Sequence, residues 1–135
     1  MKITEPTLLL NKERCLKNIE TVAKKAEKSG IIFRPHFKTH QSIVVGRWFR
    51  DFGVKKITVS SVKMAHYFAS DGWDDITIAF PVNVLELDKI NELASKIKLN
   101  IVVVDSEPIP YLLSSVGNKL GIFLKVDTGT HRTGI

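Results

Sequence analysis

Arg34, His36 and Lys38 alternate with apolar residues in one short run of the sequence. Side chains alternate across a strand, so these three are expected to share one face. Neighbouring positive charge and desolvation favour the neutral amine of Lys38, the form that attacks an aldehyde. The run therefore indicates a lysine that forms a Schiff base. It also fits a strand end where Arg34 and Lys38 reach solvent, and the local pattern leaves both interpretations open.

A second polar run, residues 125–134, is glycine-rich and follows an apolar stretch. Its glycines allow close approach of the backbone to a ligand. Arg132 offers a planar fork of donors for a phosphate, carboxylate or phenolate oxygen. Lys125 is expected to face the same way as Lys38, and Asp127 to pair with Arg132. A polar turn with a surface arginine explains the same spacing.

The elements that must carry these residues alternate between two periodicities. Apolar residues recur at helical spacing between short apolar runs typical of strands. Alternating strands and helices with short links indicate repeated βαβ units and a parallel sheet. The helices are expected at 12–28, 42–52, 61–70, 84–97 and 108–116, and the strands at 31–38, 56–60, 75–80, 99–104 and 120–126.

The helix at 42–52 carries two specific expectations. Ser42 is a plausible N-cap, because serine oxygens accept the first free backbone N–H groups of a helix. Val44, Trp48 and Phe52 are expected to fall on one face of this helix.

Two α/β folds are compatible with this alternation, a doubly wound open sheet and a (β/α)8 barrel. No phosphate-loop glycine pattern follows the first strand, which disfavours the open dinucleotide-binding sheet. A barrel needs eight strands and typically about 250 residues. The 135 residues are therefore expected to supply about the first five β/α units of a barrel. Both polar runs then lie at strand carboxyl ends, where barrel enzymes build their sites.

Composition narrows the classes of function. The formal charge is +6, but the lysines are scattered and no basic run is interleaved with aromatic residues, so no nucleic-acid partner is expected. Cys15 is the single cysteine, and no signal peptide or apolar span is evident, so a cytoplasmic protein without membrane contact is expected. No cluster has metal-ligand spacing, so no metal is expected. Asp74 and Asp75 are expected to be solvated turn residues.

The two polar runs resemble a known family. The run 34–40, Arg-Pro-His-Phe-Lys-Thr-His, resembles the first strand of fold-type III pyridoxal-phosphate enzymes, most of all the D-threonine aldolase and D-serine dehydratase branch. The run 126–134, Val-Asp-Thr-Gly-Thr-His-Arg-Thr-Gly, is similar to its fifth-strand motif. The N-terminal domain of that branch is similar to that of alanine racemase. The resemblance covers essentially the whole chain.

The resemblance implies a residue-by-residue assignment. Lys38 would hold pyridoxal 5′-phosphate as a Schiff base and act as the catalytic base or acid. Arg132 would contact the cofactor at its phenolic oxygen, in the family's manner, and His36 would lie in the cofactor-binding neighbourhood. Lys125 matches a position that is a modified lysine in some alanine racemases.

The resemblance also implies an organisation. Residues 1–135 would be a partial alanine-racemase-type barrel domain, with the rest of the barrel and a C-terminal β domain absent. That β domain carries the metal ligands in this branch, so a divalent metal would enter only through it. The full-length form would be a homodimer acting on a small amino acid, and the fragment alone would be inactive.

The implied activity is lyase chemistry on D-β-hydroxy amino acids, of the aldolase or dehydratase type. An amino-acid racemase of the alanine racemase type is an alternative, because the residues that distinguish the two would lie downstream. A further alternative is a non-catalytic protein of vitamin B6 homeostasis, or an inactive fragment. The homeostasis proteins lack the Arg-Pro-His lead that precedes Lys38 here.

Overall fold

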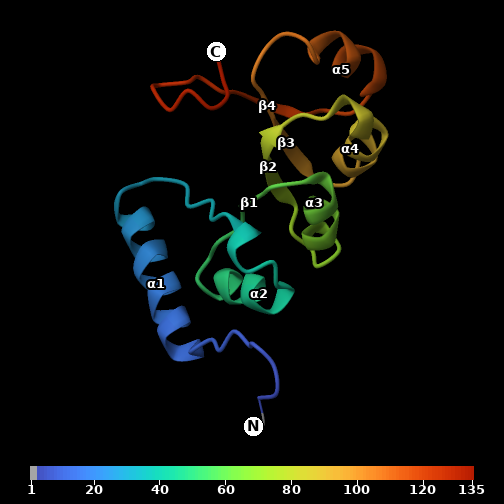
Figure 1. The fold of residues 1–135 in the computed structure, drawn as a ribbon. Helices are drawn as coiled ribbons and strands as arrows, with labels where there is room; N and C mark the ends of the chain where they lie inside the picture. The colour runs from blue at the N-terminus through green and yellow to red at the C-terminus, as the bar shows by residue number, and fades with distance from the viewer. Residues whose placement is uncertain (1–2) are drawn as a thin grey trace.

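The computed structural model describes residues 3–135 as helices packed on a parallel sheet (Figure 1). The sheet has four strands in the order β1-β2-β3-β4, and each neighbouring pair is parallel. The helices that join successive strands lie on one side of the sheet. In chain order the elements are α1 (Lys12–Lys28), η1 (Phe37–Thr39), α2 (Ile43–Asp51), β1 (Ile57–Val59), α3 (Val62–Ala69), β2 (Asp75–Pro81), η2 (Val84–Glu86), α4 (Leu87–Ala94), β3 (Lys98–Val103), α5 (Ile109–Ser115) and β4 (Gly121–Leu124).

The strand order follows the chain order without a reversal. A doubly wound sheet reverses its direction at a switch point and carries helices on both faces. Consecutive βαβ units with their helices on one side instead form an arc of a (β/α)8 barrel. The topology therefore confirms the barrel arrangement that the sequence predicts over the open sheet.

The core lies between the sheet and its helices. On β2, Ile76 and Ile78 point to the helices and are almost fully buried, as are Leu99 and Ile101 on β3. Trp73, which precedes β2, is only 2% exposed and belongs to the same cluster. The residues between them in sequence face the other side of the sheet. That other side, the interior face, carries the polar residues of the candidate site.

The first expected strand, residues 31–38, is only partly formed. Within it, His36 makes a single parallel bridge with Thr58, and residues 31–35 form no ladder. The chain then turns into the short helix η1. Pro35 has no N–H to donate to a ladder, and the ring of His36 accepts a main-chain N–H that starts the turn. Four of the five predicted strands therefore form as strands, and the segment 31–38 contributes a single bridge.

The helix α2 begins where the sequence predicts, since Ser42 Oγ accepts the Val45 N–H at 3.4 Å. The face of Val44, Trp48 and Phe52 is turned inward only in part. Trp48 and Phe52 are half-buried, but Val44 is 59% exposed, and the fully buried residue of the helix is Gly46. A Cβ added to Gly46 would lie 3.1 Å from Cε2 of Phe37. The absent side chain lets α2 approach a buried aromatic ring, which a count of apolar residues does not detect.

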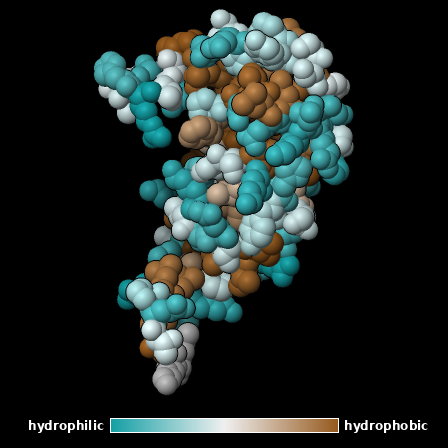
Figure 2. All heavy atoms as spheres, turned by 45° about the vertical axis from the view of Figure 1, so that its right-hand side comes forward, coloured by the Kyte–Doolittle hydropathy of each residue, from teal (hydrophilic) through white to brown (hydrophobic). Residues whose placement is uncertain are grey.

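Both edges of the arc leave apolar side chains exposed. On β4, Ile122, Phe123 and Leu124 are 55%, 51% and 59% exposed. At the opposite edge Ile31 and Ile32 are exposed as well. Figure 2 shows apolar atoms at the surface at the end of the molecule that carries α5 and β4. Among residues 3–135, no helix has both the length and the apolar character that crossing a membrane requires.

Candidate functional site

Lys38 is the middle residue of η1, at the point where the chain leaves the sheet. Its side chain is exposed, whereas Phe37 beside it is fully buried. His36 caps the turn, because its Nδ1 accepts the main-chain N–H of Lys38 at 3.2 Å. Thr39 Oγ1 donates to the His36 carbonyl at 3.4 Å. The turn therefore presents the Lys38 amine to solvent while its neighbours hold the backbone.

The ring of Phe37 anchors this turn in the core. Besides His40, the rings of Phe49, Phe68 and Trp73 surround it, with centroids at 5.1, 5.0 and 5.2 Å. The Trp73 ring meets it edge-on, at an interplanar angle of 89°. Edge-to-face pairs stabilise beyond the area that they bury. The position of Lys38 is thus fixed by the preceding residue, Phe37, which cannot move without disturbing the core.

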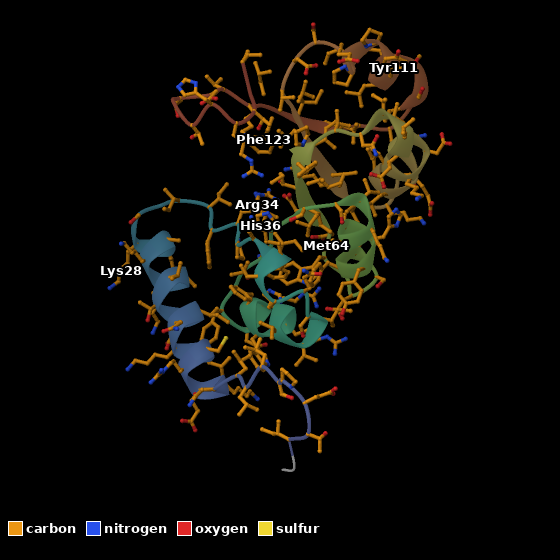
Figure 3. All side chains as sticks on the ribbon, in the orientation of Figure 1. Lys28, Arg34, His36, Met64, Tyr111 and Phe123 are labelled. Carbon is orange, nitrogen blue, oxygen red and sulfur yellow. The ribbon has the colours of Figure 1, made fainter. Side chains whose placement is uncertain are left out.

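His36 lies between the Lys38 turn and the sheet. Burial, followed by the positive charge of Lys38, lowers the pKa of His36 from its ordinary value of 6.5. Since Nδ1 accepts a hydrogen bond, the hydrogen-bond pattern assigns the proton of the neutral ring to Nε2. Figure 3 shows His36 and Arg34 on the side of the sheet away from α3 and α4, the interior face. His36 is therefore a neutral donor at that face.

His40 connects the turn to α2. Its Nδ1 accepts the main-chain N–H of Ser42 at 3.1 Å, and its ring lies 4.6 Å from that of Phe37 and 5.9 Å from that of Phe49. Burial lowers the pKa of His40, and the Ser42 hydrogen bond opposes that shift. Within the described residues its Nε2 is buried without a hydrogen-bond partner. His40 is thus a neutral, mainly structural ring.

Arg34 meets its counter-charge at the opposite end of the sheet from Lys38. Its Nη2 donates to Asp75 Oδ1 at 2.7 Å, and its Nη1 donates to the carbonyls of Ile57 and Asp75, both at 3.2 Å. Burial raises the pKa of Asp75, but the hydrogen bond from Arg34 and the charges of Arg34, Lys98 and Lys56 bring it below the usual range. The prediction of a solvated Asp75 was wrong, since it is 8% exposed.

Asn100 extends this contact to the next strand. Its Nδ2 donates to Asp75 Oδ1 and to the Ile76 carbonyl, both at 3.2 Å. A Cβ on Gly121 would lie 2.1 Å from Asn100 Oδ1, so the amide occupies the space that a side chain on β4 would need. We call Arg34, Asp75 and Asn100 the polar layer. It crosses the interior face at the amino ends of the strands.

Arg132 lies in the loop that follows β4. Asp127 Oδ1 accepts the N–H groups of Gly129 and Thr130 at 2.9 and 2.8 Å. These backbone hydrogen bonds, the one from Gly129 first, lower the pKa of Asp127. The expected pairing of Asp127 with Arg132 was wrong, because the carboxylate folds the loop through its backbone. Arg132 is exposed.

The ends of this loop are joined. Asp127 N–H donates to the Ile135 carbonyl at 2.9 Å, and Ile135 N–H donates to the Lys125 carbonyl at 3.0 Å. The Lys125 ammonium donates to Thr133 Oγ1. The loop around Arg132 is thus closed on itself and held at the end of β4.

The structure brings Lys38 and His36 into direct contact and places Arg132 on the same edge. The segment of Lys38 runs parallel to β1, and the loop of Arg132 starts where β4 ends. The carboxyl ends of parallel strands share one edge, so both face it. Four strand spacings of about 4.8 Å separate the two along the arc, about 19 Å before curvature shortens the direct path.

Sequence reasoning missed the polar layer. A signal was present, because Asp75 and Asn100 fall on the positions of their strands that alternate away from the core. Which strand each would meet depends on the pairing register.

No group of three or more His, Cys, Asp or Glu side chains that could hold a metal ion occurs within residues 3–135.

Comparison with known proteins gives a consistent picture. Residues 10–135 match the family model described as alanine racemase, N-terminal domain. The chain is 28% identical to D-threo-3-hydroxyaspartate dehydratase of Delftia sp. (strain HT23), over 100% of this chain and 37% of that protein. It is 30% identical to D-serine dehydratase of Saccharomyces cerevisiae, over 96% of this chain and 36% of that protein.

Solved structures agree. The D-threonine aldolase of Filomicrobium marinum matches with a TM-score of 0.90 at 21% identity, over 98% of this chain and 37% of that one. The Delftia dehydratase matches with a TM-score of 0.81 at 26% identity, over 91% of this chain and 34% of that one. The chain thus spans little more than a third of the length of these proteins, and its strands correspond to one part of their fold.

Proposed function

Because the chain belongs to the family of the alanine racemase N-terminal domain, we propose that it is the cofactor-binding part of a pyridoxal-phosphate enzyme that cleaves or dehydrates D-β-hydroxy amino acids. The observation that carries the proposal is Lys38, exposed in a capped turn at the carboxyl edge of a parallel sheet and in contact with a neutral histidine. Residues 1–135 would form part of a barrel domain.

The residues present fit the cofactor. Lys38 offers an exposed primary amine for covalent attachment to the aldehyde. Arg132 and Lys125 bring positive charge to the same edge, which suits an anionic phosphorylated ligand. Pyridoxal phosphate supplies the electron sink for the bond broken at the substrate α-carbon.

The side chains of this chain have separate tasks in the proposal. Lys38 would hold or deliver a proton at the substrate α-carbon. His36 donates from Nε2 and keeps Lys38 in its turn through Nδ1. Arg132 would help to hold the cofactor, from a loop that Asp127 preorganises.

The named relatives favour lyase chemistry over racemisation. The curated relatives at 28% and 30% identity are a D-threo-3-hydroxyaspartate dehydratase and a D-serine dehydratase. A dehydratase of this kind removes a β-hydroxyl group from a D-amino acid. The same substrate class is therefore proposed here. We also infer a cytoplasmic enzyme whose full-length form is a homodimer, while residues 1–135 alone lack activity.

The test is chemical labelling of Lys38. The chain is incubated with pyridoxal phosphate, reduced with borohydride, and mapped by mass spectrometry. We expect one dominant phosphopyridoxyl group on Lys38, lost in Lys38→Ala together with the visible absorption band of the bound cofactor. Lys63→Ala, which removes an exposed lysine of α3, is the matched control and should keep both. Equal labelling of Lys38 and Lys63 would contradict the proposal.

A further inference from the structure

We propose that the polar layer is a positioning device that sets the register of the segment carrying Lys38 against the sheet. Arg34, Asp75 and Asn100 are its positioning residues, and none of them touches the proposed cofactor. The inference deepens the proposed function and rests on it for its catalytic consequence. The register itself can be measured without the cofactor.

The segment needs such a device because its own ladder is minimal. Its pairing with β1 consists of the His36–Thr58 bridge, with Thr58 N–H donating to the Pro35 carbonyl at 2.8 Å. By contrast, β2 and β3 pair over most of their length. A strand with few ladder bonds has a weakly specified register. The position of Lys38 along the strand direction must therefore be fixed by another contact.

Arg34 supplies that contact through its shape. One guanidinium reaches three acceptors on two successive strands, the carbonyls of Ile57 and Asp75 and the Asp75 carboxylate. A slip that keeps the faces correct moves the segment by two residues, about 6.6 Å. Every one of these bonds would then break, and the Asp75 carboxylate, whose side chain is 11% exposed, would lose its guanidinium partner.

The nearby lysines do not replace this contact. Lys56 and Lys98 lie 3.7 and 3.5 Å from Asp75 Oδ2, with side chains 32% and 66% exposed. An ammonium on a flexible stem is a point charge without a fixed fork. These lysines help to keep Asp75 ionised, but they do not select one register of the segment that carries Lys38.

The layer also reaches the far side of the site. Asn100 binds Asp75 on β2, and its amide fills the space beside Gly121 on β4. The strand β4 leads into the loop of Arg132. A continuous set of contacts therefore runs from the Lys38 segment to the strand that carries Arg132, at the end of the sheet away from the chemistry.

Two variants test the register, with a control of the same kind. Asp75→Asn removes the negative charge that binds the Arg34 guanidinium. The milder Arg34→Lys keeps the positive charge but loses the planar guanidinium. Asp71→Asn is the matched control, because Asp71 is also bound by two cations, Arg47 and Arg50, and its side chain is 5% exposed, but it lies away from the interior face.

The readouts are amide hydrogen exchange at Thr58 and borohydride labelling of Lys38 relative to Lys63, both with global stability measured in parallel. A charge-assisted hydrogen bond corresponds to a factor of about ten or more, so we expect at least that acceleration at Thr58 in Asp75→Asn and Arg34→Lys. Labelling of Lys38 should fall by a similar factor, with Lys63 unchanged. In Asp71→Asn both should follow the wild type.

Other outcomes are decisive. Exchange at Thr58 that rises equally in all three variants, in step with lost global stability, would make the layer a general stabiliser and overturn the proposal. Wild-type exchange in Arg34→Lys would overturn it too, and that variant carries the test if Asp75→Asn does not fold. If exchange responds as expected but wild-type Lys38 takes no label, the register role stands and the proposed cofactor function fails.

Discussion

At the scale of single residues, the site depends on side chains that accept main-chain N–H groups. His36, His40 and Asp127 each do so next to a proposed functional residue or to the helix that follows it. Such local bonds fix turns that no ladder supports. The precision of the Lys38 and Arg132 positions is thus built from short-range contacts rather than from the sheet alone.

Gly121 should be intolerant of any side chain. In Gly121→Ala the new Cβ would collide with the Asn100 amide at 2.1 Å, and we expect a loss of about 1–3 kcal/mol in the free energy of unfolding. Urea denaturation measures it. Gly117→Ala is the control, because nothing lies within 4 Å of its added Cβ. In the double variant Asn100→Ala with Gly121→Ala, the two losses should be less than additive.

His40 should make stability depend on pH. The folded protein disfavours the charged ring, so below the ordinary pKa of 6.5 the unfolded chain binds a proton that the folded chain does not. Stability is complete above that pH and is lost as the pH falls through the lower folded pKa. His40→Asn, which keeps an acceptor for Ser42, should flatten this dependence in urea titrations. His36 retains part of it, because burial lowers the pKa of that ring as well.

At the scale of elements, the position of α2 depends on the absence of a side chain at Gly46. Gly46 lets the helix lie against Phe37, whose neighbour in sequence is Lys38. The sequence predicts the helix and its Ser42 cap because both depend on local chemistry. It does not predict the buried face, because the ring that selects Gly46 comes from a different element. The same holds for Arg34, whose partner Asp75 is 41 residues away.

Gly46→Ala should therefore destabilise the protein although alanine favours helices. The propensity gain is about 1 kcal/mol, but Phe37 is fully buried and its ring lies 3.1 Å from the added Cβ, so crowding should win. Thermal unfolding should show a lower midpoint, and Lys38 labelling should slow. Val44→Ala, on the exposed face of α2, should leave both close to wild type. A higher midpoint in Gly46→Ala would show that Phe37 yields.

What the sequence predicts well is the alternation of helices and strands, since it follows from periodicity. The turn at Lys38 and its cap by His36 were not predicted, because a strand was expected to continue through residue 38. The polar layer and the hydrogen bonds that fold the loop of Arg132 were not predicted. Asp75 and Asn100 meet only after β2 and β3 pair in register. The Asp127 carboxylate accepts backbone N–H groups and does not pair with the Arg132 side chain. These N–H groups lie two and three residues away, so no second side chain has to be ordered.

At the scale of the whole molecule, the arc ends in an exposed apolar strand. Ile122, Phe123 and Leu124 of β4 are each more than half exposed. Exposed apolar edge strands template pairing with other chains. The 135-residue chain should therefore self-associate with rising concentration.

Phe123→Lys should reduce that association, since a lysine on an edge strand opposes pairing. Sedimentation velocity across a concentration series would measure it, and unfolding by urea should change little because Phe123 is half exposed. Leu113→Lys, at an 81% exposed position of α5, removes a similar apolar surface away from the strand edge and should have the smaller effect. Equal relief by both variants would assign association to apolar area in general.

The unreversed strand order has a consequence for synthesis. Each strand pairs with the one made just before it, so every ladder closes as soon as its second strand and connecting helix have emerged. Local contacts of this kind form quickly. Arg34 has its acceptors once β2 has been translated, so the Lys38 turn can be in place while the ribosome is still producing β3 and β4. The turn that carries Lys38 can therefore form before the rest of the sheet has been synthesised.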